Sequence, residues 1–205
     1  MGLRDILTGR RQVKGPAPDR LFAISTAYVT LQTEHQISPA GAAAIVFQAL
    51  ATSEFEAALR EMEEVVKSAG GDTGTSVSTQ DDSYGYRWMI LRSPEGAPSV
   101  EDLAVGINAV AGSIEAAGYG ERLLCAVFAF KDDSTAGARD GGRIYFIYNY
   151  KRGYWYPFVP VAGKQGPDGG ERSTERELQL KAQLADELPI EPELERWFPL
   201  WGIPI

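Results

Sequence analysis

The sequence is poor in the side chains that most often bind metals or act as nucleophiles. Its 205 residues include one histidine, His35, and one cysteine, Cys125. His35 stands beside Glu34 just before a predicted turn, where a solvated residue is expected rather than a ligand or a base. Cys125 stands among apolar neighbours with no cation nearby in the sequence to lower its pKa, which is typical of a core thiol. We therefore expect no metal, no cofactor and no catalytic residue.

Long apolar runs, a basic surface and a phosphate-binding loop are also missing. No stretch approaches the ~18 apolar residues that cross a bilayer, and the first residues lack the apolar run of a signal peptide. A lone cysteine fits a reducing compartment. The net charge of -8 argues against nucleic acid as a partner. These absences predict a cytoplasmic protein, with peripheral contact at the inner face of the membrane as an alternative.

The N-terminal arm, residues 1–18, is the basic part of an otherwise acidic chain. We predict a short helix over residues 1–8, followed by a linker, and then a single domain over residues 19–205. The residues expected to contact a membrane surface or a partner are Leu3, Arg4, Ile6, Leu7, Arg10 and Arg11. Three apolar anchors bind lipid weakly, so packing against the domain or a mobile tail is the alternative.

Periodicity and turn residues predict the secondary structure of the domain. Predicted strands cover residues 27–33, 43–50, 75–80, 84–91, 123–130, 144–150 and 154–158. Ser38 to Gly41 are expected to form a turn between the first two. Capping boxes predict helices that start at Ser53, Ser99 and Thr174 and end near Gly70, Gly118 and Pro189.

The order of these elements predicts an α+β fold. Two strands followed by a capped helix occur three times, so we expect ββα-like units that form a largely antiparallel sheet with helices mainly on one face. The run over residues 123–130 is apolar throughout, which is typical of a strand covered on both faces in the middle of a sheet.

Two aromatic segments are candidate binding surfaces. Large rings and arginine dominate interface hot spots, but the same rings also suit a core. The first segment presents Lys151, Arg152, Tyr154, Trp155, Tyr156 and Phe158, and the second, near the C-terminus, presents Trp197 and Trp201. Burial against the chain's own domain and docking onto a partner are both open from sequence.

Several strings spread along the chain resemble the PspA-associated PspAB family of the bacterial envelope-stress (phage shock) system. They are MGLRDIL at 1–7, YVTL at 28–31, DSYGY at 82–86, YKRG at 150–153, YPF at 156–158, ELP at 187–189 and WFPLWG at 197–202. The resemblance implies a partner, PspA, the coiled-coil membrane-stress effector, or another envelope-stress protein. It implies no reaction and no catalytic residue.

These observations favour a non-catalytic adaptor or regulator that contacts PspA. One alternative is a small-molecule or peptide-binding module that uses residues 151–158. A further alternative is an enzyme that uses carboxylates, for which Asp81-Asp82 and Asp132-Asp133 are the available pairs, although aspartate is also the residue that turns favour.

Overall fold

The computed structural model describes residues 18–135, 142–161, 163 and 170–205. The residues predicted for the arm, Leu3 to Arg11, lie outside this part of the chain, as does most of the predicted loop at 163–170. The helices are α2 (Pro18–Phe22), α3 (Ile24–His35), α4 (Ser53–Thr73), α5 (Val100–Ala116) and α6 (Thr174–Gln183). The strands are β1 (Ile37–Gln48), β2 (Ser76–Asp81), β3 (Tyr86–Arg92), β4 (Leu123–Asp132), β5 (Arg143–Asn149) and β6 (Tyr154–Phe158).

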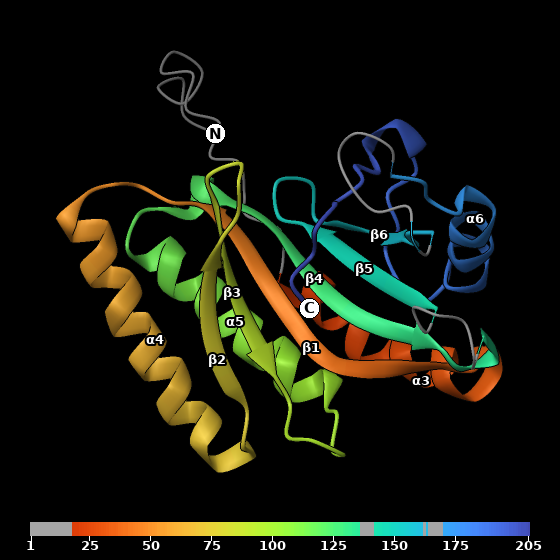
Figure 1. The fold of residues 1–205 in the computed structure, drawn as a ribbon, viewed down its shortest axis with the longest axis horizontal. Coiled ribbons are helices and arrows are strands. Elements are labelled where there is room, and N and C mark those ends of the chain that lie inside the picture. The colour runs from red at the N-terminus through yellow and green to blue at the C-terminus, as the bar shows by residue number, and fades with distance from the viewer. Residues whose placement is uncertain (1–17, 136–141, 162, 164–169) are drawn as a thin grey trace, which may run out of the picture.

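The strands form one sheet in the order β2-β3-β1-β4-β5-β6, and every neighbouring pair is antiparallel. The predicted fold class, an α+β domain with a largely antiparallel sheet, is confirmed. Helices α3 and α5 lie behind the sheet, and the C-terminal end of the chain crosses in front of it (Figure 1). The sheet is thus covered on both faces, but only one cover is helical.

Each face of the sheet has its own apolar core. The helical face buries Phe47, Phe128 and Trp155 against residues of the helices, among them Leu31 and Ile107. The opposite face buries side chains of β1, β3, β4, β5 and β6 against residues 190–205, which we call the C-terminal strap. Because successive residues of a strand point to opposite faces, β4 contributes Phe128 to the first core and Val127 to the second. Its prediction as a central strand is confirmed.

The predicted strand at residues 27–33 is wrong, because these residues belong to α3. Tyr28, Val29 and Leu31 suggested alternation, but the buried positions of this segment are Ile24, Ala27 and Leu31, which are spaced by three and four as on a helix. The helix ends at Gln36, which has a left-handed φ of 53° and whose N–H donates to the Leu31 carbonyl.

The predicted turn at Ser38 to Gly41 is also wrong, since β1 continues through it. Pairing with β4 shifts register between Pro39 and Ala43, and Gly41 has a φ of +71°. A proline without an N–H and a glycine at positive φ suit a β-bulge as well as a turn. The first predicted ββα unit is therefore helix, bulged strand, helix.

The helix starts were predicted to within one residue. Ser99 caps α5, since its hydroxyl accepts a hydrogen bond from the Asp102 amide at 3.1 Å. The other two caps lie one residue before the predicted positions, where Thr52 accepts from Phe55 N–H and Ser173 accepts from Arg176 N–H. Helix α6 ends at Gln183, earlier than predicted.

Removal of the Ser99 cap is expected to destabilise the domain. Ser99→Ala leaves an amide of the first turn of α5 without its partner and should lower the free energy of unfolding by about 1 kcal/mol. Ser113→Ala is the matched control, because Ser113 is an exposed serine within the same helix whose hydroxyl donates to the Ala109 carbonyl. It should change stability by less than ~0.5 kcal/mol. Urea denaturation followed by circular dichroism measures both, and equal losses would contradict the assignment.

Candidate functional site

The first aromatic segment forms the β5–β6 hairpin and divides its rings between the two faces of the sheet. Trp155 is fully buried on the helical side, where its indole N–H donates to the Arg20 carbonyl at 2.7 Å. Tyr156 and Phe158 point to the opposite face and lie in the core beneath the strap. Tyr154 is half-buried, with the Arg20 and Arg152 guanidinium groups over its ring.

Arg152 fastens the strap to this hairpin. Its guanidinium donates to the two carboxylate oxygens of Glu191 at 2.5 and 3.0 Å, and it also contacts Glu193 at 3.4 Å. Glu191 is buried. Burial alone would raise the pKa of Glu191, but hydrogen bonds from Arg152 and from the Glu193 amide outweigh it, and the pKa is lowered. The predicted contact residue Arg152 thus has an intramolecular partner.

Trp197 anchors the middle of the strap. Its ring is 4% exposed and stacks on Tyr156 with centroids 6.3 Å apart, while its indole N–H donates to the Glu191 carbonyl at 3.0 Å. The Trp197 carbonyl accepts a hydrogen bond from Arg172 at 2.6 Å. A buried ring with its polar groups satisfied is a core residue, so Trp197 belongs to the fold and not to an exposed surface.

The remainder of the strap is held by tyrosine hydroxyls of the sheet. Tyr156 donates to the Phe198 carbonyl at 3.1 Å, and Tyr145 donates to the Ile205 carbonyl at 3.0 Å. Arg92 donates to the Pro204 carbonyl at 3.0 Å. The strap therefore crosses from β6 to β3 over the second face of the sheet.

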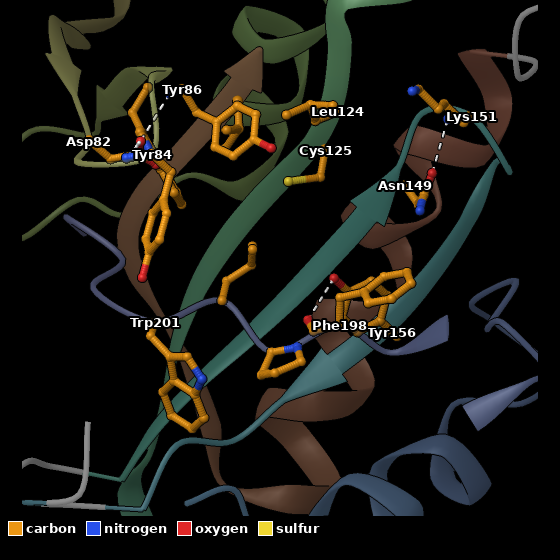
Figure 2. Close-up of a pocket in the computed structure, with 14 residues that line it drawn as sticks. Asp82, Tyr84, Tyr86, Leu124, Cys125, Asn149, Lys151, Tyr156, Phe198 and Trp201 are labelled. Atoms are coloured by element: carbon orange, nitrogen blue, oxygen red, sulfur yellow. Dashed lines mark hydrogen bonds between the residues drawn. The ribbon is translucent and has the colours of Figure 1, made fainter. Parts of the chain in front are cut away.

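A cavity of about 380 Å³ lies between the strap and one end of the sheet. Figure 2 shows its walls: the β2–β3 turn with Tyr84, the start of β3 with Tyr86, the start of β4 with Leu124 and Cys125, the β5–β6 hairpin with Lys151, and the strap with Trp201. The lining residues are Val46, Asp82, Tyr84, Tyr86, Trp88, Leu124, Cys125, Asn149, Lys151, Tyr156, Phe198, Pro199, Leu200 and Trp201. Of the predicted site residues, Lys151, Tyr156 and Trp201 line it.

Several polar groups of the wall already have partners within the protein. Asp82 accepts from the amides of Tyr84 and Tyr86 at 2.9 Å each and from the Trp88 indole at 3.0 Å. Asn149 accepts from the amides of Lys151 and Arg152. Lys151 is exposed, and its ammonium forms no ion pair with the part of the chain that the structure describes. It is thus the one charged group of the wall that lacks a protein partner there.

Cys125 lies at the floor of the cavity, where Figure 2 shows its sulfur directed into the space between the labelled residues. Burial raises the pKa of the Cys125 thiol to about 12, so the thiol is neutral at physiological pH. A neutral thiol is a weak nucleophile, and Cys125 therefore acts as an apolar part of the wall.

Three exposed aromatic rings surround the mouth of this cavity. Tyr84 is 62% exposed, Tyr86 37% and Phe198 58%. Sequence reasoning missed them as site residues. Tyr84 was predicted in a strand but lies in the turn before it, Tyr86 was correctly predicted in a strand and is the first residue of β3, and Phe198 stands between two tryptophans. The available signal was the pair of tyrosines beside Gly85, whose φ of +83° forms the tight turn that turns the rings outward.

Of the carboxylates predicted as candidates for chemistry, Asp82 lines the cavity, whereas Asp81 and Asp132 are not in its wall. Asp81 pairs with Arg87 at 2.6 Å, and Asp132 pairs with Arg176 at 2.8 Å. His35 is in the last turn of α3. Within residues 18–135, 142–161, 163 and 170–205, no three His, Cys, Asp or Glu side chains are grouped as metal ligands would be. In the same part of the chain, no helix is long and apolar enough to cross a membrane.

Fold and site together define an α+β domain with a ligand-sized, aromatic-rimmed cavity under an irregular C-terminal segment. The family model described as PspAB, PspA associated protein B, matches residues 1–205, so the chain belongs to this family. The predicted resemblance is thereby confirmed. No curated protein and no solved structure matches the chain.

The Glu191 ion pair is expected to stabilise the strap in a pH-dependent manner. Glu191→Gln removes the charge at nearly constant shape and should lower the free energy of unfolding at pH 7 by about 1–2 kcal/mol. Glu195→Gln, in the exposed next turn, is the control and should be close to neutral.

The sign of the pH dependence follows from the lowered pKa of Glu191. The stabilisation is present above the pKa of an unfolded glutamate, about 4.3, and is lost as pH falls through the lower folded pKa. Wild type and Glu191→Gln should therefore converge in acid. Urea denaturation at pH 7 and in steps to pH 3 measures this, and a constant difference would contradict the role of the charge.

Proposed function

We propose that the chain is a non-catalytic adaptor or regulator that associates with PspA, or with another protein of the bacterial envelope-stress response. Family membership supports this proposal, because the family is described by its association with PspA. The observation in the structure that carries it is the exposed ring cluster Tyr84, Tyr86 and Phe198 around a concave site. Aromatic anchors beside a pocket are typical of the hot spots of protein interfaces.

The geometry of this cluster suits a partner's side chain better than a reaction. Tyr84 lies in the β2–β3 turn, Tyr86 begins β3 and Phe198 belongs to the strap. Hydrogen bonds hold the backbone at each of these positions, so little backbone entropy is lost on binding. The cavity beneath them can receive an apolar side chain. The carboxylates Asp81, Asp82 and Asp132 are hydrogen-bonded or ion-paired within the protein, which supports binding rather than acid–base chemistry.

Loss of the rim rings is expected to weaken association with PspA. Tyr84→Ser combined with Phe198→Ser should weaken binding at least tenfold, because each removes an exposed anchor without disturbing a buried core. Val65→Ser combined with Val105→Ser is the control, since both valines are 58% exposed but lie on α4 and α5, on the helical side of the sheet. Biolayer interferometry with purified PspA measures affinity. Failure of the wild type to retain PspA or any envelope-stress protein from stressed cells would overturn the proposal.

A cytoplasmic location with peripheral membrane contact belongs to the same proposal. The basic arm, with Leu3, Ile6 and Leu7, provides weak apolar and electrostatic attraction to anionic lipid. Ile6→Asp is expected to reduce co-sedimentation with vesicles of phosphatidylserine and phosphatidylcholine severalfold, and Val29→Asp, an exposed position on α3, should leave it unchanged. Equal co-sedimentation of Ile6→Asp and wild type would remove the arm from the proposal.

The cavity favours a second function, the binding of a small molecule. Its volume of about 380 Å³ lies within the range of roughly 300–1,000 Å³ that small-molecule sites occupy. Lys151 and Tyr156 of the predicted segment line it, whereas Trp155 lies on the other face of the sheet.

A further inference from the structure

We propose that the cavity beneath the C-terminal strap binds a small amphiphilic monoanion: an apolar body on the aromatic and aliphatic wall, and a carboxylate or similar acid group at Lys151. This inference rests on the second proposed function, small-molecule binding in this cavity, and names the class of ligand. It does not depend on association with PspA.

The wall accounts for the apolar body. Val46, Leu124 and Leu200 contribute aliphatic side chains, and Trp88 and Trp201 contribute rings. Cys125 adds a neutral thiol at the floor. Apolar surface of this kind is unfavourable when exposed to water, and a ligand that covers it removes that cost. The cavity therefore selects for an apolar occupant.

The charge of the occupant follows from the two ionised side chains that line the cavity, Asp82 and Lys151. Asp82 accepts three hydrogen bonds from the protein, so its oxygens already have donors and offer little further capacity to a ligand. Lys151 has no ion-pair partner among the described residues. Of the two groups, the Lys151 ammonium is the one whose donors remain free, which favours an anion at that side of the cavity.

The acidity of the whole chain does not reverse this preference. The net charge of -8 is spread over the molecule, and salt screens exposed charges beyond about 8 Å at physiological ionic strength. A carboxylate at the rim thus responds mainly to Lys151. Arg152, the adjacent cation, is engaged by Glu191 and Glu193 and is not in the wall.

The size of the cavity limits the occupant to a small molecule, and the strap closes one side of it. Phe198 to Trp201 form that side, and the Tyr156 hydroxyl holds the Phe198 carbonyl in place. Lys151 stands at the opposite side of the cavity from Trp201 (Figure 2). An elongated ligand can therefore place its apolar end against Trp201 while its acid group stays near Lys151.

Isothermal titration calorimetry of the full chain without PspA tests the inference. The probe is decanoate, and decyltrimethylammonium is the matched cation with the same alkyl chain. We expect decanoate to bind at one site and the cation to bind at least tenfold more weakly. Equal binding of the two probes, or no binding of decanoate, would overturn the proposal.

Two variants locate the binding. Lys151→Met keeps the length of the side chain but removes its charge. It should weaken the affinity for decanoate about fivefold, the effect expected from loss of one partly exposed ion pair. Lys131→Met is the control, because Lys131 is an exposed lysine of β4 outside the wall, and it should have no effect. Leu124→Trp fills the cavity and should abolish binding. Equal affinities of the two lysine variants would contradict the assigned anion site.

If Leu124→Trp does not fold, fluorescence quenching of the wild-type protein tests the same site. 10-Bromodecanoate should quench tryptophan fluorescence, since bromine quenches on contact and Trp88 and Trp201 line the cavity. Trp201→Phe should reduce the quenched fraction. Binding of the bromo acid without quenching would place the ligand elsewhere and overturn the proposal. These experiments contain no PspA, so a failure of the chain to bind PspA would not change their outcome.

Discussion

The buried Glu191 carboxylate is the contact on which the second half of the structure depends. It joins the β5–β6 hairpin, through Arg152, to the start of the C-terminal strap. The same residue also extends the sheet edge: the Glu191 amide donates to the Trp155 carbonyl at 2.8 Å, and the Trp155 amide donates to the Pro189 carbonyl at 2.9 Å. A buried carboxylate is unfavourable unless its oxygens are bonded, so one geometry of hairpin and strap is selected.

This contact explains how an antiparallel sheet can be apolar on both faces. The helices cover one face, and without the strap the other would expose Trp88, Val127, Tyr156 and their neighbours to water. The strap covers them without regular secondary structure, and its carbonyls are satisfied by Tyr145, Tyr156 and Arg92. Pairing at β6 also protects an edge strand that would otherwise offer free backbone groups. The cavity remains where the strap and the β2–β3 turn do not meet.

Local sequence signals predicted the class of fold, because they depend on neighbours in the chain. The Ser99 cap and the apolar run of β4 were correctly interpreted, and so was the α+β class. Where two local readings competed, tertiary burial decided: the segment around Val29 packs as a helix, and Pro39 with Gly41 form a bulge within β1. Period and turn chemistry alone cannot separate such cases.

The site was only partly predictable, for a different reason. Lys151, Tyr156 and Trp201 were proposed from their residue types and do line the cavity, but Trp155 and Trp197 have the same chemistry and lie in the cores. The face on which a ring lies depends on strand alternation and on the path of the strap, which requires contacts between residues about 40 positions apart. Tyr84 and Tyr86 become site residues only because the fold places the β2–β3 hairpin and the strap as two walls of one cavity.

The shared wall also places a physical constraint on the two proposed activities. Phe198 stands at the mouth of the cavity and belongs to the rim cluster proposed to contact a protein partner, while its carbonyl is held from below by Tyr156. A ligand in the cavity and a partner on the rim would therefore contact the same short segment of the strap. Binding free energies at two sites that share a structural element are linked reciprocally: whatever factor the ligand imposes on the affinity of the partner, the partner imposes on the ligand. Because the strap has no secondary structure of its own beyond one turn at Leu194–Arg196, it is the element through which such linkage would act.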